Sequence, residues 1–217
     1  WRRDDRGELR ISAGVRARYW DLNRELLNSP RAQHLYKPLG GKRDISYRLA
    51  TGLYFQAPFN RELRAFDGAV NPDLLAQKSF HLVGGFTLDF YLGKRNPKKF
   101  RFITEAYYKD MWDLVSYEIE NVRIRYSGQN DASGYAMGID FRLNGEFVPG
   151  AESWINLSLL RTRERLTDVQ HLEREINVEE AVPVNDVPRP TDQLMQLSMF
   201  FQDYLRTNEH VKLHLNL

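Results

Sequence analysis

Apolar and polar residues alternate with a period of two along most of the chain. Between residues 8 and 20, one face is apolar and the other carries Arg10, Arg16 and Arg18. Successive side chains of a strand point to opposite faces of a sheet, so the pattern predicts a half-buried β-strand. It recurs and predicts about nine strands, at residues 8–20, 26–38, 45–56, 79–92, 100–109, 135–144, 153–162, 192–203 and 211–217. The weakest is 26–38, because Pro30 interrupts it and His34 has no clear side.

The connections between these strands fall into two length classes. Short, turn-rich segments such as 38–43 and 93–99 alternate with three long ones, at residues 57–76, 110–133 and 163–191. The short connection 21–24 lies on the same side as the long ones. Short turns at one end of an antiparallel sheet and long loops at the other are typical of an up-and-down outer-membrane β-barrel. No helical period and no linker composition interrupts the pattern, so residues 1–217 are predicted to form an all-β, single partial domain.

Alternation alone leaves two fold classes open, since a soluble β-sandwich also alternates. The predicted strands are longer than the usual strands of soluble sheets and match a tilted bilayer crossing of about ten residues. Aromatic residues also cluster near the strand ends, as in an interfacial girdle: Tyr19, Trp20, Tyr54, Phe55, Phe90, Tyr91, Tyr107, Tyr108, Phe147 and Trp154. Both features favour a transmembrane barrel, with the apolar face toward lipid and the polar face toward a wet lumen.

Composition and motifs exclude several function classes. The 31 basic residues nearly balance the 29 acidic ones and form no long basic block, so no nucleic-acid partner is predicted. The chain has no cysteine, which excludes disulfides, zinc–thiolate sites and a thiol nucleophile. No apolar run is long enough for a transmembrane helix. No GxSxG, HExxH or P-loop pattern occurs, so we predict neither an enzyme nor a cofactor.

Five stretches carry a family resemblance: "SPRAQHLYKP", "LATGLYFQAPFNREL", "VNPDLLAQKSFHLVGGFTLDF", "EAYYKDMWDLVSYEIENVRIRYSGQNDASGYAMGIDF" and "PRPTDQLMQLSMFFQDYL". They resemble the C-terminal barrel strands of TonB-dependent outer-membrane receptors, of the type abundant in the Bacteroidota. The resemblance implies a barrel of about 22 strands with a plug domain in its lumen. It also implies nutrient uptake driven by the TonB–ExbB–ExbD complex, with a surface substrate-binding lipoprotein as a further partner. The ligand class stays open between glycan, peptide, siderophore and cobalamin.

The plug and the remaining strands are absent from this sequence, so the chain is expected to be a fragment. As a fragment, it is expected to need the rest of its barrel and the plug as partners. Its expected location is the cell outer membrane, in contact with outer-membrane lipid. The alternative is a soluble all-β surface adhesin or glycan-binding module. A need for detergent distinguishes the two, because unpaired strand edges and an apolar face are not stable in water.

Loop residues are the predicted ligand contacts, because aromatic and arginine side chains on exposed loops are over-represented at binding sites. The candidates are Arg61, Glu62, Arg64, Trp112, Tyr117, Arg123 and Arg125. Two alternatives for the arginines stay open: they tie loops to one another, or they contact lipopolysaccharide phosphates.

Two acidic groups have more ordinary interpretations. Glu105 and Asp140 resemble a carboxylate pair, but on a lumen wall we expect them to match Arg101 and Arg142. Residues 128–134, "GQNDASG", could offer oxygen ligands to calcium, although an Asx-rich turn before a strand is favoured. No metal site is therefore predicted.

Overall fold

The computed structural model describes residues 2–4, 7–41, 43–94, 96–148, 151–174, 180–204 and 212–216. Every regular element in these ranges is a β-strand. The long strands and the last strand are β2 (Gly7–Trp20), β3 (Glu25–Pro38), β4 (Asp44–Gln56), β5 (Gln77–Leu92), β6 (Lys98–Leu114), β9 (Ala132–Val148), β10 (Ala151–Leu166), β14 (Met195–Tyr204) and β15 (Lys212–Asn216). The short ones are β1 (Arg2–Asp4), β7 (Tyr117–Glu120), β8 (Arg123–Tyr126), β11 (His171–Glu173), β12 (Val182–Val184) and β13 (Val187–Pro188). No helix in this part of the chain could cross a membrane.

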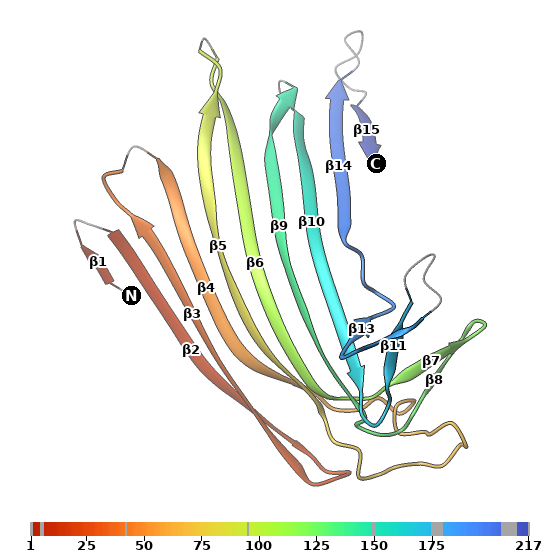
Figure 1. Cartoon of the computed structure of the whole chain (residues 1–217). Helices are drawn as coiled ribbons and strands as arrows, with labels where there is room; N and C mark the ends of the chain where they lie inside the picture. The colour runs from red at the N-terminus through yellow and green to blue at the C-terminus, as the bar shows by residue number, and fades with distance from the viewer. Residues whose placement is uncertain are drawn as a thin grey trace.

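The long strands, β1 and β15 form one antiparallel sheet, in which successive members pair once the separate β7–β8 and β11–β12 pairs are left out. Its order is β1-β2-β3-β4-β5-β6-β9-β10-β14-β15, with β13 paired to β10. Figure 1 shows a single curved layer with short turns at one end and the long loops at the other. The predicted all-β, up-and-down sheet of about nine strands is confirmed. The described strands form an open sheet and do not close into a barrel.

The weakest predicted strand is a full strand. β3 pairs with β2 along its whole length, and Pro30 lies opposite Val15. Its ladder to β4 covers only Arg31–Tyr36. Pro30 therefore stands just outside that ladder, where its missing N–H removes no bond to β4. His34, which has no clear side in the sequence, lies opposite Ile11 and Leu49 on the apolar face.

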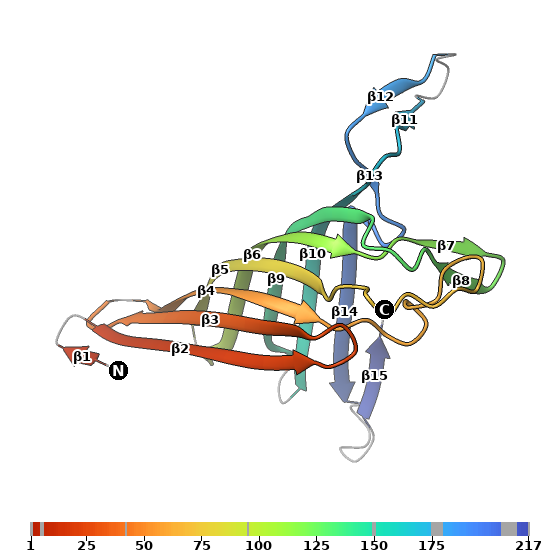
Figure 2. The ribbon, with the colours of Figure 1, turned by 90° about the horizontal axis from the view of Figure 1, so that it is seen from below.

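The register aligns the apolar residues of successive strands into one continuous surface. Phe86, for example, lies opposite Tyr47 on β4 and Thr104 on β6, and the Phe86 ring contacts Tyr47 and Phe102. This surface is uncovered: Val15 is 73% exposed and Met195 is 62% exposed. No second layer packs on the described sheet (Figures 1 and 2). The buried hydrophobic cluster lies instead among the loops, around Leu63, Leu74 and Val115.

The long connections contain structure that strand alternation does not predict. The segment between β6 and β9 includes the β7–β8 hairpin, and the segment between β10 and β14 includes the β11–β12 pair. In Figure 2 these two hairpins project from the loop end of the sheet in different directions. The connection predicted at residues 57–76 is correct. Those predicted at 110–133 and 163–191 begin too early, because β6 continues to Leu114 and β10 to Leu166, and neither is a plain loop.

Candidate ligand-binding site at the loop end of the sheet

The connections that follow β4 and β6 pack against each other around a small hydrophobic core. Leu63, Leu74 and Val115 are buried together, and Tyr126 of β8 packs against them. Leu74 is only 1% exposed. Removal of apolar surface from water is the main favourable term in folding, so this cluster gives the two connections a defined shape. We call residues 57–76 and 115–131 together the loop platform.

Backbone and amide hydrogen bonds join the two halves of the loop platform. The side-chain amide of Asn71 donates to the Gly128 carbonyl at 2.8 Å, and its Oδ1 accepts from the Asp73 backbone N–H at 3.1 Å. Gly128 has a φ of 71°, a conformation that favours glycine. A Cβ on Gly128 would stand 2.9 Å from the Ala65 backbone nitrogen. The close approach of the two segments therefore requires glycine here.

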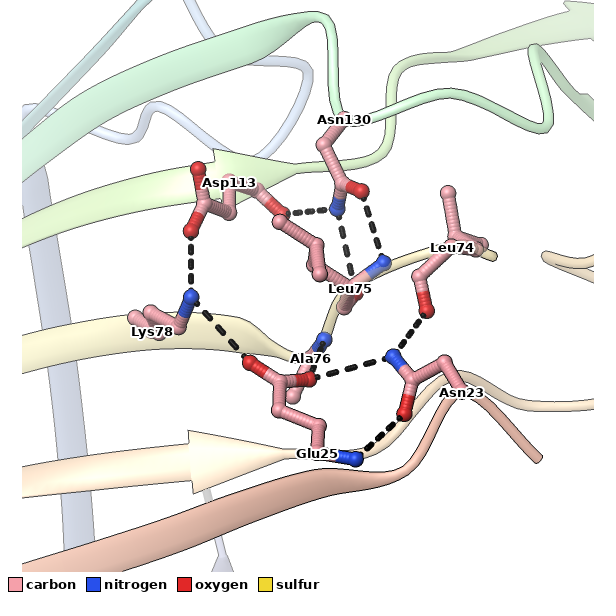
Figure 3. A network of polar contacts seen from close by, with 8 residues as sticks. All are labelled: Asn23, Glu25, Leu74, Leu75, Ala76, Lys78, Asp113 and Asn130. Atoms are coloured by element: carbon pink, nitrogen blue, oxygen red, sulfur yellow. Dashed lines mark hydrogen bonds and ion pairs between the residues drawn. The ribbon is translucent and has the colours of Figure 1, made fainter. Parts of the chain in front are cut away.

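Asn130 links three segments of chain with one side chain (Figure 3). Its Oδ1 accepts from the Leu75 N–H at 2.8 Å, and its Nδ2 donates to the Leu75 carbonyl at 3.1 Å. The same nitrogen donates to the Asp113 carbonyl at 2.7 Å. Asp113 has a φ of 54° at an irregularity in the β6–β9 register. Asn130 therefore connects the loop platform to the rim of β6.

Charged side chains anchor the loop platform to the sheet. Lys78 of β5 forms ion pairs with Asp113 of β6 at 2.7 Å and with Glu25 of β3 at 3.2 Å. Glu25 also accepts a hydrogen bond from the Ala76 N–H at 2.8 Å. Asn23, in the short β2–β3 turn, donates to the Leu74 carbonyl at 2.9 Å. Figure 3 shows these contacts as one network that crosses the loop ends of three strands.

The network shifts the pKa values of its two rim groups, which lie at strand ends beyond the apolar band. Burial acts to raise the pKa of Glu25, but hydrogen bonds from Ala76, Asn23 and Lys78, with the Lys78 charge, hold it below its ordinary value. Burial acts to lower the pKa of Lys78, but Asp113 and Glu25 hold it above its ordinary value. Both groups are therefore charged at neutral pH, which keeps the ion pairs formed.

The three predicted contacts in residues 57–76 differ in their surroundings. Arg61 and Arg64 are exposed on the loop platform. Glu62 is buried, with 6% of its surface exposed. Its carboxylate accepts from the Phe59 N–H at 2.8 Å and from the Gln77 side-chain amide at 2.9 Å. The prediction that Glu62 is an exposed loop residue is therefore wrong. The turn at residues 59–62 folds back, and both carboxylate oxygens of Glu62 accept hydrogen bonds within the protein.

The remaining aromatic candidates are only half-exposed. The prediction that Trp112 is a loop residue is wrong, because β6 continues to Leu114 and places Trp112 opposite Lys78 at the rim of the sheet. Tyr117 begins β7, and its ring lies 6.1 Å from the Tyr126 ring across the hairpin. Arg123 begins β8 and is exposed. These side chains are spread around the loop platform and do not meet at one point.

Arg125 ties the β7–β8 hairpin to the first loop. Its guanidinium donates to the Phe66 carbonyl and lies 5.5 Å from the centre of the Phe66 ring. It also forms an ion pair with Glu120 at 3.1 Å. The alternative interpretation, in which an arginine joins one loop to another, is thus confirmed for Arg125. A role in ligand contact stays a prediction for all seven candidates.

A group on the polar face was missed from the sequence. The Arg31 guanidinium lies 4.4 Å from the centre of the Tyr54 ring, which stacks on His81 at 4.3 Å. Gly52 lies opposite Arg31 on β3 and His81 on β5, and so leaves space between them. The group stands in the loop half of the sheet. The register between strands brings Arg31, Tyr54 and His81 together. The alternation within a single strand does not reveal that register, so the sequence alone does not predict the group.

Ion pairs on the polar face also differ from expectation. Arg101 pairs with Asp89 at 2.7 Å, and Glu105 pairs with Arg48. The expected match of Glu105 and Asp140 with Arg101 and Arg142 is therefore wrong for Arg101 and Glu105. Residues four apart on a strand stand about 13 Å apart, whereas residues on adjacent strands stand about 5 Å apart. Gly85 lies between Arg48 and Glu105 in the register. Because glycine has no side chain, the Arg48 and Glu105 side chains can meet across it.

The oxygen-rich segment 128–134 is a structural turn. Asp131 accepts from the Ser116 N–H at 2.9 Å and from the Ser116 hydroxyl at 2.8 Å. The Asn130 side-chain oxygen is used by Leu75. Within the described ranges, no three histidine, aspartate or glutamate side chains are grouped so that they could hold a metal ion. The Asx-turn interpretation agrees with these bonds.

No family model, curated protein or solved structure matches this chain. The functional argument therefore depends on the sheet, its two faces and the loop platform.

Proposed function

We propose that this chain forms part of the wall of an outer-membrane β-barrel that imports a nutrient ligand. The observation that carries the proposal is the uncovered apolar face of a single-layer, up-and-down sheet. Soluble monomers rarely expose a contiguous apolar patch of more than a few hundred Å². A bilayer covers such a face, and the opposite polar face then lines a lumen.

The unequal ends of the sheet support the same arrangement. Outer-membrane barrels have short periplasmic turns and longer extracellular loops. On this basis the loop platform faces the outside of the cell. The short connections from β3 to β4 and from β5 to β6 face the periplasm.

The family resemblance extends the proposal to a TonB-dependent receptor. In that role the barrel has about 22 strands and holds a plug, and the TonB–ExbB–ExbD complex supplies energy for uptake. A surface lipoprotein delivers the ligand, which belongs to the glycan, peptide, siderophore or cobalamin class. The exposed arginines of the loop platform supply guanidinium groups suited to carboxylate or phosphate on such a ligand. The Arg31–Tyr54–His81 group supplies a stacking surface farther into the lumen.

Uptake by the complete receptor tests the proposal. We expect the receptor to fractionate with the outer membrane, to need detergent for extraction, and to lose uptake when TonB is deleted. Replacing Arg61 and Arg64 with alanine should weaken uptake while assembly stays intact, because exposed loop residues rarely set stability. The matched control is Asn60→Ala, an exposed position on the same loop. Monodisperse, cooperatively unfolding protein in water without detergent would instead support the soluble adhesin.

A further inference from the structure

Three arginines occupy the apolar face at the loop end of β10. In the β9–β10 register, Arg161 lies opposite Met137, Arg163 opposite Tyr135 and Arg165 opposite Ser133. Alternation places these arginines on the same face as Leu157 and Leu159. We call them the arginine ladder. Because this face is the uncovered one, the arginine ladder faces whatever surrounds the sheet.

An aromatic pair marks the depth of the arginine ladder. The Tyr108 and Tyr135 rings stack at 6.4 Å, and Tyr108 is 41% exposed on the same face. Tyrosine rings on membrane proteins lie at the level of the lipid head groups. Arg163, directly opposite Tyr135, and Arg165, farther toward the loops, therefore lie at or above the head-group level on the loop side.

An apolar groove leads from the arginine ladder into the apolar band. It is lined by residues including Leu82, Gly84, Ala106, Leu159 and Arg161. Gly84 and Ala106 lie opposite each other in the β5–β6 register. Their small side chains lower the surface there, and the larger Leu82 and Leu159 stand on either side of it.

The arginine ladder has guanidinium nitrogens that are available to bind an external anion. Within the described part of the chain, Arg161 has no hydrogen-bond or ion-pair partner. The Nε of Arg163 is buried and has no hydrogen-bond partner there either. Arg165 donates through Nε to the Asn185 carbonyl at 2.8 Å, which leaves its terminal nitrogens available. Asp110 is an acidic residue on this face, but it lies opposite Tyr135, two strands from Arg163.

We propose that the arginine ladder and its groove bind a glycolipid of the outer leaflet that carries two phosphates. The inference rests on the proposed function, which puts the loop end of the sheet in the outer leaflet. Guanidinium groups bind phosphate through paired, charge-assisted hydrogen bonds. Arg161 and Arg165 stand about 13 Å apart along the strand, a spacing at which each guanidinium can bind a phosphate of its own, and this favours a head group with two. One acyl chain lies in the groove below.

The test uses the complete receptor, purified in detergent and examined by native mass spectrometry. The probes are diphosphorylated lipid A, monophosphorylated lipid A and phosphatidylglycerol. The variant Arg161→Gln/Arg165→Gln removes two exposed charges and keeps the half-buried Arg163. The control Arg10→Gln/Arg16→Gln removes two exposed charges from the polar face, where Arg10 lies opposite Leu35 and Arg16 opposite Ser29.

We expect wild type and control to retain diphosphorylated lipid A most strongly, and the ladder variant to bind it about tenfold more weakly or worse. Equal binding by wild type and ladder variant would overturn the site. An equal or greater preference for phosphatidylglycerol would overturn the glycolipid as its occupant. A receptor that transports normally but gives either result refutes the site alone. A receptor that never reaches the membrane refutes the proposed function and the site together.

Discussion

The side chain of Asn130 pairs with both backbone polar groups of Leu75, 55 residues away in sequence, much as a neighbouring strand would. One hydrogen bond runs in each direction, at 2.8 and 3.1 Å. Leu75 directly follows the buried Leu74, so this pairing fixes the segment that supplies the hydrophobic core of the loop platform. The shape of the loop platform therefore depends on a few polar contacts as well as on apolar packing.

Asn130→Asp tests that dependence with almost no change of shape. A carboxylate cannot donate, so the carbonyls of Leu75 and Asp113 would each lose a donor. Because these bonds are exposed or only partly buried, the loss of each should cost about 0.5–1.5 kcal/mol. We expect faster protease cleavage within residues 57–76, with assembly of the sheet retained. Asn60→Asp, the same chemical change at an exposed position, should leave cleavage unchanged, and equal cleavage of the two variants would contradict the role of Asn130.

Two glycines allow a matched test of close packing within the loop platform. Gly68 and Gly128 both have positive φ, at 89° and 71°. A Cβ at Gly68 would meet nothing within 4 Å, whereas one at Gly128 would stand 2.9 Å from the Ala65 nitrogen. Both alanine variants carry a backbone cost of about 1–2 kcal/mol. Only Gly128→Ala should also separate the two halves of the loop platform, measured as faster hydrogen exchange of the Leu75 backbone N–H, which donates to Asn130 in the other half.

Acid should loosen the anchor between the loop platform and the sheet. The pKa of Glu25 lies below its ordinary value of 4.5 in the folded protein. Its contribution to stability is therefore fully present above 4.5 and is lost as the pH falls through the lower folded pKa. We expect the melting temperature in detergent to fall over this range for wild type, and to fall less for Glu25→Gln. Parallel curves for the two proteins would show that Glu25 carries no part of the effect.

The sheet could be predicted from the sequence because the period-two alternation of apolar and polar residues is visible within each long strand on its own. Even β3, interrupted by Pro30, keeps enough apolar residues at alternate positions to be identified. The β7–β8 hairpin had a weaker signal: Tyr117 and Ile119 alternate with glutamates, and Asn121 takes the positive φ of 56° at the turn. An alternation this short does not distinguish a strand from the surrounding loop.

The site was less predictable because it depends on contacts between distant segments. Arg61 and Glu62 are adjacent, yet one is exposed and the other is buried. Burial of Glu62 depends on Gln77, which reaches it only after the loop has closed. In the same way, Tyr54 and His81 lie on different strands, and their stacking follows from the register. Period-two patterns assign a side chain to a face but do not identify its neighbours.

The assignment of the two faces can be tested with one substitution at adjacent positions. Leu88 lies between Ile45 and Phe102 on the apolar face, and Thr87 lies between Ser46 and Ile103 on the polar face. An arginine on the lipid face of a barrel costs about 2–4 kcal/mol near the bilayer midplane. Leu88→Arg should therefore impair assembly of the complete receptor, while Thr87→Arg should not, as judged by the amount recovered in the outer membrane. The reverse result would place the lumen on the other side of the sheet.

The neighbours Arg61 and Glu62 separate ligand contact from loop stability. Glu62→Ala removes the acceptor for the Phe59 N–H and the Gln77 amide in a buried setting, which should cost the loop platform about 1–3 kcal/mol. Arg61→Ala changes an exposed side chain and should alter stability by less than about 0.5 kcal/mol. We expect protease cleavage of residues 57–76 to rise only for Glu62→Ala, and uptake at equal receptor levels to fall for Arg61→Ala without any change in cleavage. If Arg61→Ala leaves uptake unchanged, then Arg61 does not contact the ligand.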